Sequence, residues 1–118
     1  SKIIYLTIDD APSSDCLNKL DYLDQHGIKA VWFCEGKRIE EFPTYAAEIL
    51  NRGHIIGNHL YSHPWCSDIP VETVLQEIDT TDQLINQVHA TTGIERTRHF
   101  FLFLFGDKGD GLRVDVLA

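Results

Sequence analysis

Positively charged residues are scarce in this sequence. Lysine and arginine together number 10, against 18 aspartate and glutamate residues, so the formal net charge is −8. Nucleic acids and anionic membrane surfaces repel a chain of this charge, and neither is an expected partner. Long apolar runs are also lacking, and no stretch of the sequence is long enough to span a bilayer. The charge remains compatible with a neutral or cationic substrate.

Cysteine is limited to Cys16, Cys34 and Cys66. Because this odd number shows no paired spacing, we expect three reduced and mostly buried thiols, and we give little weight to thiol catalysis. Reduced thiols mildly favour a cytoplasmic location. The first residues, Ser1-Lys2-Ile3-Ile4, lead straight into an apolar run and show no signal-peptide pattern, although a cleaved signal would leave no trace.

Apolar runs and amphipathic stretches alternate along the 118 residues, a length that allows one domain with one core. Strands are predicted at 2–8, 28–34, 54–57 and 99–105. Helices are predicted at about 15–26, 43–52 and 71–88, with a fourth beginning within 112–118. Gly27, Gly53 and Thr92-Gly93 are expected to end the first three. This alternation predicts an α/β fold with a parallel sheet and alternating helices.

The same pattern predicts which side chains are buried. The first strand reads as buried on both faces, and a loop at 9–14 follows it. Ser13, Ser14 or Asp15 is expected to cap the first helix. Apolar positions at helical spacing give the first and third helices a buried face, formed by Leu17, Leu20 and Leu23 in one and by Val71, Val74, Leu75, Ile78, Ile85 and Val88 in the other.

Polar residues follow the first and third predicted strands. Asp9 and Asp10 come after one, and His59 and His63 come after the other. Residues four apart share one face of a helical turn, so both imidazoles can reach one ion. Each pair alone is weak evidence, because paired histidines are usually ordinary surface or core residues and an Asp-Asp pair usually lies in a turn or a helix cap. Together, at the strand ends where α/β proteins place their sites, they predict a site for Zn²⁺, Co²⁺ or another divalent ion.

These two runs resemble motifs of the polysaccharide deacetylases of carbohydrate esterase family 4, which include chitin, chitooligosaccharide, peptidoglycan and xylan deacetylases. The first motif reads Thr-Ile-Asp-Asp-Ala-Pro at 7–12, and the second reads His-Leu-Tyr-Ser-His at 59–63. The approach to the second motif at 53–58 and the second strand at 30–36 also match. The resemblance extends over nearly the whole chain.

The resemblance implies part of a distorted (β/α) barrel and a metal-dependent hydrolysis of N- or O-acetyl groups on an oligo- or polysaccharide. It places Asp10, His59 and His63 on a divalent metal, most often zinc, and makes Asp9 the general base that activates water. Members of the family are often exported. Two aromatic residues near the second motif, Tyr61 and Trp65, are candidates for stacking on a sugar, with packing of the loop as the alternative.

The sequence departs from the family's pattern in its second half. Leu102 and Leu104 stand where the third motif has arginine and proline, and Leu60 replaces serine or threonine in the second. The histidine that serves as general acid has no counterpart. We therefore expect residues 1–118 to form one domain that is incomplete at its C-terminal end. An open barrel edge would allow pairing of two copies.

Three functional hypotheses follow. The first is a metal-dependent carbohydrate deacetylase, supported by the two motifs. The second is a non-catalytic relative that binds a metal and a glycan, suggested by the missing arginine and acid. The third is a small α/β interaction module in which the histidines and aspartates are incidental.

Overall fold

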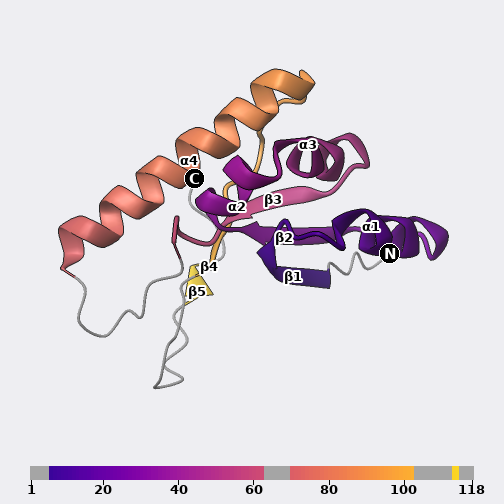
Figure 1. Cartoon of the computed structure of the whole chain (residues 1–118), viewed down its shortest axis with the longest axis horizontal. Coiled ribbons are helices and arrows are strands. Elements are labelled where there is room, and N and C mark those ends of the chain that lie inside the picture. Colours follow the sequence, from indigo (N-terminus) through magenta and orange to yellow (C-terminus); the bar gives the residue numbers. More distant parts are fainter. Residues whose placement is uncertain (1–5, 63–69, 103–112, 115–118) are drawn as a thin grey trace.

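The structure, a computed structural model, describes residues 6–62, 70–102 and 113–114 (Figure 1). Strands and helices alternate along most of this part of the chain. Their bounds are β1 (Leu6–Ala11), α1 (Cys16–Gln25), β2 (Ala30–Cys34), α2 (Gly36–Glu41), α3 (Pro43–Asn51), β3 (Ile55–Asn58), α4 (Val71–Thr92), β4 (Phe101–Leu102) and β5 (Arg113–Val114). Among the described residues, no helix is both long and apolar enough to cross a membrane.

The strands form one sheet in the order β1-β2-β3-β4-β5. Neighbours from β1 to β4 run parallel, and β5 runs antiparallel to β4. The parallel part curls into a half-barrel with alternating helices, so the predicted α/β fold is confirmed. Trp32 of β2 pairs with Ile8 on one side and with Ile56 on the other. This register brings the carboxyl ends of the first three strands to one edge of the sheet.

Alternation along β2 divides the buried side chains between two clusters. All five residues of this strand are buried. Trp32 packs in the larger cluster, which includes residues of α1, α3 and α4, whereas Val31 and Phe33 pack with Leu102 in a smaller one. Because successive side chains of a strand point to opposite faces, the two clusters lie on opposite faces of the sheet. Burial on both faces makes β2 the centre of the fold.

The prediction for the first strand is wrong in two respects. β1 continues through Asp9 and Asp10 to Ala11, so these residues do not begin a loop. Most of β1 is also exposed, with Leu6 at 48%. Within the described sheet β1 is an edge strand that pairs with β2 alone, which leaves its other edge and much of its surface uncovered.

The helices differ from prediction in their caps, their number and their buried faces. Asp15 is the N-cap residue of α1, but its side chain makes no capping hydrogen bond. A short extra helix, α2, fills the stretch before Pro43, where the sequence predicts no helix. The left-handed Gly27 and Gly93 follow α1 and α4, as expected for helix ends. α4, the third predicted helix, continues past Val88, the last apolar position of its pattern, and ends at Thr92 beside Gly93, as the sequence predicts.

Three apolar helix positions that the pattern predicts as buried are exposed. Leu17 lies at the surface of α1, where Cys16 is buried in its place. Val71 and Leu75 are 68% and 59% exposed, because the first turns of α4 project beyond the other described elements (Figure 1). The fourth strand begins at Phe101, two residues later than predicted, and 103–105 lie outside the described residues.

Candidate metal and catalytic site

Three side chains of types that can bind a metal ion meet at the carboxyl edge of the sheet. Asp10, Glu35 and His59 come from the ends of β1, β2 and β3, and one ligand atom of each lies within 4.8 Å of the others. Parallel neighbouring strands deliver these residues to a common edge, as predicted for Asp10 and His59. Glu35 and His59 are buried, whereas the Asp10 side chain is 51% exposed. The site therefore has a buried floor and an open side.

The pairing of β1 with β2 is irregular at the position of Asp10. Ile8 pairs with Trp32 and Ala11 with Cys34, so β1 holds one more residue than β2 between these pairs. Asp10 adopts a left-handed conformation at this point, with φ of 58°. An extra residue of this kind changes the direction in which a side chain points, and such bulges recur beside active sites. The Asp10 Oδ1 atom lies 3.2 Å from His59 Nε2.

A backbone contact determines which nitrogen of His59 faces Asp10. Nδ1 of His59 lies 2.9 Å from the carbonyl oxygen of Leu102. A carbonyl can only accept a hydrogen bond, so Nδ1 carries the hydrogen and donates it. In the neutral ring, Nε2 then holds a lone pair directed toward Asp10. Histidine ligands of metals are commonly oriented by such a contact on the second nitrogen.

The distance between His59 Nε2 and Asp10 Oδ1 fits two ligands of one divalent cation. Nitrogen and oxygen ligands lie about 2.0–2.2 Å from zinc, which separates neighbouring ligands on one ion by about 3.0–3.5 Å. The observed separation of 3.2 Å between Nε2 and Oδ1 falls in this range. A lone pair and a carboxylate at this distance repel each other unless a cation or a proton lies between them. The described residues therefore fit a metal ion.

The segment after His59 is a loop, so the expected helical turn is wrong. Leu60 has a positive φ of 66°, which a right-handed helix does not allow. Asn58 stabilises the bend by accepting a hydrogen bond from the Leu60 N–H and donating one to the carbonyl of Ile78. His63 lies outside the described residues, so its predicted role as a ligand stays a prediction.

Glu77 of α4 holds the next part of this loop. One of its carboxylate oxygens accepts hydrogen bonds from the backbone N–H groups of Tyr61 and Ser62, both at 2.9 Å. The other oxygen accepts the Ser62 hydroxyl at 2.9 Å. The carboxylate therefore satisfies three donors of the loop that joins His59 to His63. Sequence analysis did not single out Glu77, because it reads as one of several acidic residues on an amphipathic helix.

The remaining predicted site residues are Asp9, Tyr61 and Trp65, and the structure describes the first two. Asp9 is exposed on β1, directly beside Asp10. The Tyr61 hydroxyl donates a hydrogen bond to a carboxylate oxygen of Glu40, and this contact raises the pKa of Tyr61. Trp65 lies outside the described residues. A contact of Tyr61 or Trp65 with substrate stays a prediction.

Glu35 is the site residue that sequence analysis missed. It lies in the stretch 30–36 that matches the family, but neither its pattern nor the resemblance gives Glu35 a role. A signal was nevertheless present, since Glu35 directly follows a fully apolar strand that lies between the two strands carrying Asp10 and His59. Its side chain is only 2% exposed and lies 3.2 Å from the Arg38 guanidinium.

The described thiols are unsuited to catalysis. Cys16 and Cys34 are both free and buried. Burial raises the pKa of Cys16 to about 11 and raises the pKa of Cys34 well above its ordinary value. Both thiols are therefore protonated at neutral pH, and a protonated thiol is a poor nucleophile. Cys66 lies outside the described residues.

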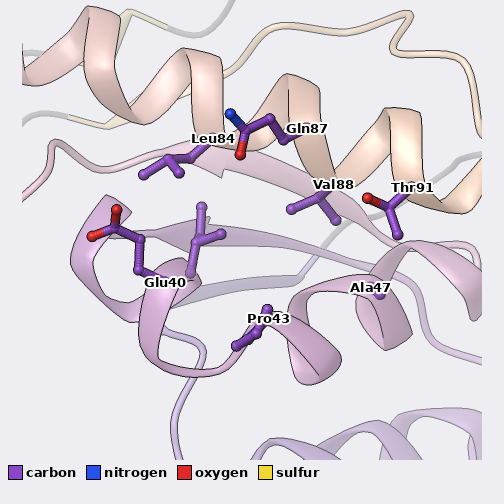
Figure 2. Close-up of a pocket in the computed structure, with 8 residues that line it drawn as sticks. Glu40, Pro43, Ala47, Leu84, Gln87, Val88 and Thr91 are labelled. Carbon is purple, nitrogen blue, oxygen red and sulfur yellow. The ribbon is translucent and has the colours of Figure 1, made fainter.

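A separate cleft of about 300 Å³ lies among the helices (Figure 2). Figure 2 shows residues of α2, α3 and α4 around it, and Glu40 is the one charged side chain in its lining. The other residues that line it are Ile39, Pro43, Ala47, Leu84, Gln87, Val88 and Thr91. None of the site residues named above borders this cleft, so it takes no part in the candidate site.

The fold is a parallel α/β half-barrel with histidine and carboxylates at its carboxyl edge, and comparison with known proteins identifies the family. The sequence model for polysaccharide deacetylases matches residues 1–111. The chain therefore belongs to the polysaccharide deacetylase family, whose members are carbohydrate esterases.

Named relatives agree with this assignment. A peptidoglycan-N-acetylglucosamine deacetylase of Bacillus cereus is 38% identical over 86 residues, which cover 72% of this chain and 31% of the relative. A chitooligosaccharide deacetylase of Rhizobium leguminosarum bv. trifolii is 29% identical over 98 residues, which cover 82% of this chain and 46% of the relative. The chain thus spans less than half the length of either protein.

Solved structures of the family share the fold. The peptidoglycan deacetylase PdaC from Bacillus subtilis superimposes with a TM-score of 0.75 at 29% identity. The matched region covers 92% of this chain and 52% of PdaC. The described half-barrel therefore corresponds to about half of a solved deacetylase chain.

Proposed function

We propose that this chain carries the metal-binding and base residues of a divalent-metal-dependent deacetylase that hydrolyses N- or O-acetyl groups on a carbohydrate. The observation that supports this most directly is the 3.2 Å approach of His59 Nε2 to Asp10 Oδ1, with the ring oriented by the Leu102 carbonyl. The two residues belong to the two motifs that the family shares. Membership of the family adds the reaction class.

Asp10, His59 and His63 would hold the ion, for which zinc is the expected identity and cobalt an alternative. A bound divalent ion would polarise the acetyl carbonyl and lower the pKa of a water molecule beside it. The buried His59 ring keeps its lone pair directed to the site because its other nitrogen donates to Leu102. The exposed side of Asp10 leaves the site open to a bulky glycan.

Asp9 is the residue proposed to move the proton. Its carboxylate would accept a proton from the attacking water, whose oxygen then forms a bond to the acetyl carbon. The carbon–nitrogen or carbon–oxygen bond to the sugar then breaks while the proton held by Asp9 passes to the departing nitrogen or oxygen, and acetate and the free amine or hydroxyl are the products. Exposure of Asp9 on the edge strand is compatible with access from solvent.

The proposed substrate is an acetylated oligo- or polysaccharide. Relatives are named as deacetylases of peptidoglycan and of chitooligosaccharides, both of which carry acetylated amino sugars. The chain's excess of acidic residues fits a neutral or cationic glycan better than an anionic polymer. Tyr61, within the second motif, and Trp65, two residues after it, are the proposed sugar contacts, since aromatic rings provide flat apolar surfaces.

The test combines metal content with acetate release from acetylated chitooligosaccharide. We expect about one zinc or cobalt ion per wild-type chain, and Asp10→Ala should lose it because its carboxylate is a proposed ligand. Asp9→Asn should keep the metal and lose at least about a hundredfold in rate, as expected when a general base is removed. Asp79→Asn, which changes an exposed residue of α4, is the control and should match wild type.

Other outcomes would point to other functions. Release of the metal by Asp9→Asn but not by Asp10→Ala would show that the two roles are reversed. Stoichiometric metal and glycan binding without turnover would identify a non-catalytic relative. Absence of bound metal from the wild-type chain would contradict a metal-dependent activity.

A further inference from the structure

Glu35 occupies a central and well-fixed position in the site. It follows β2, the strand between those that carry Asp10 and His59. Its backbone N–H donates to the carbonyl of Ala11 at 3.1 Å, and the N–H of the next residue, Gly36, donates to the carbonyl of Leu60 at 2.9 Å. The two hydrogen bonds attach the end of β2 to both neighbouring motifs. The backbone of Glu35 is consequently fixed between them.

The charges around this carboxylate favour a cation. Burial of a carboxylate is costly unless positive charge compensates it. Arg38 supplies one positive charge, with Nε 3.2 Å from Glu35 Oε1. The carboxylate of Asp10 lies in the same group, and Asp9 is adjacent to it in sequence. A divalent cation between the carboxylates of Glu35 and Asp10 would lower their mutual repulsion.

The distances allow Glu35 to reach the ion that Asp10 and His59 would share. Two ligands on one ion at about 2.0–2.2 Å can be at most about 4.4 Å apart. The ligand atoms of all three residues already lie within 4.8 Å of one another. A small side-chain rotation is enough to close the difference.

We propose that Glu35 is an additional ligand of the same divalent ion, a proposal that rests on the metal site of the proposed function. The site then combines carboxylates from β1 and β2 with imidazole from the segment after β3. A second carboxylate increases the negative charge on the site and strengthens its affinity for divalent cations. It also adds a hard oxygen ligand, which improves binding of manganese relative to zinc.

The experiment measures binding of Zn²⁺ and Mn²⁺ to the metal-free full chain by titration calorimetry at pH 7. Glu35→Gln should weaken the affinity for both ions at least tenfold, with the larger loss for Mn²⁺. Glu41→Gln removes the same charge from an exposed position of α2, and its affinities should equal those of wild type. Circular dichroism of the metal-free proteins verifies folding. Equal affinities in Glu35→Gln and wild type would overturn the proposal.

A second variant covers the case in which Glu35→Gln does not fold. Glu35→Asp keeps the charge beside Arg38 but shortens the side chain, so the Co²⁺ absorption spectrum should shift as the ligand set changes. An unchanged spectrum would overturn the proposal. If wild-type protein and both variants bind metal equally well, only the proposed role of Glu35 is contradicted. Wild-type protein that binds no metal contradicts this role and the proposed function together.

Discussion

Glu77 and Ser62 are joined by two hydrogen bonds, one from the backbone N–H of Ser62 and one from its hydroxyl. Both are 2.9 Å long, and they end on different oxygens of the same carboxylate. The pair connects the loop of the second motif to α4, a helix that contributes no ligand to the candidate site. A residue of the helical layer thus holds Ser62, the residue directly before the second histidine of the motif in sequence.

Removal of this carboxylate should weaken metal binding without touching a ligand. Glu77→Ala leaves three loop donors without their acceptor, so we expect about tenfold weaker zinc affinity, the size of effect seen when supporting hydrogen bonds of a metal site are lost. Glu77→Gln keeps one carbonyl oxygen for the two N–H groups and should restore most of the affinity. Titration calorimetry measures both variants.

Glu72→Ala is the matched control for this prediction, because Glu72 is exposed in the first turn of the same helix. Its zinc affinity should equal that of wild type. Glu77→Ala with normal affinity would show that the loop holds its conformation without the carboxylate.

His54 should make stability depend on pH between neutral and mildly acidic conditions. Its Nδ1 accepts the Ala30 N–H at 3.0 Å, so the ring must be neutral at this nitrogen. Burial, with a smaller effect of the Lys29 charge, lowers the pKa of His54 below 6.5. The unfolded chain therefore binds the proton first as pH falls. The contribution of neutral His54 to the free energy of unfolding should be complete above about pH 6.5. It should decrease as pH falls toward the pKa of His54 in the folded protein.

Urea unfolding at pH 7.5 and pH 5.5 measures this dependence. His54→Asn should be less stable than wild type at pH 7.5 but should lose less stability on acidification. Part of the dependence should remain, because burial also lowers the pKa of His89. His26→Asn changes an exposed histidine and should behave as wild type. An identical pH dependence in His54→Asn and wild type would exclude His54 as the source.

Gly36 should not tolerate a side chain. A Cβ at this position would lie 2.6 Å from Thr81 Oγ1 and 2.6 Å from Tyr61 Cδ1, closer than atoms in van der Waals contact. Gly36→Ala should therefore lower the free energy of unfolding by about 1–3 kcal/mol, as overpacking of a core does. Thermal and urea unfolding measure the loss. Glu41→Ala at the exposed end of the same helix is the control, and equal losses in both would contradict the steric explanation.

Much of the fold could be predicted from local pattern. The apolar runs of β2 and β3 mark buried strands, and the predicted helix ends at Gly27 and Gly93 are confirmed, because only a left-handed residue continues the chain there without strain. Long-range packing decided the rest. Val71 and Leu75 have helical spacing, yet they are exposed because α4 extends beyond the surfaces that would cover it.

The candidate site shows the same division. Sequence alone determined the residue types and the strand ends at which Asp10 and His59 appear, because a parallel sheet brings its carboxyl ends together and a metal site needs imidazole and carboxylate. Only the tertiary structure decided how these residues meet. The extra residue in β1 accompanies Asp10, the Leu102 carbonyl orients His59, and strand order places the buried Glu35 between them. Each of these contacts joins segments far apart in the chain, and no local pattern records them.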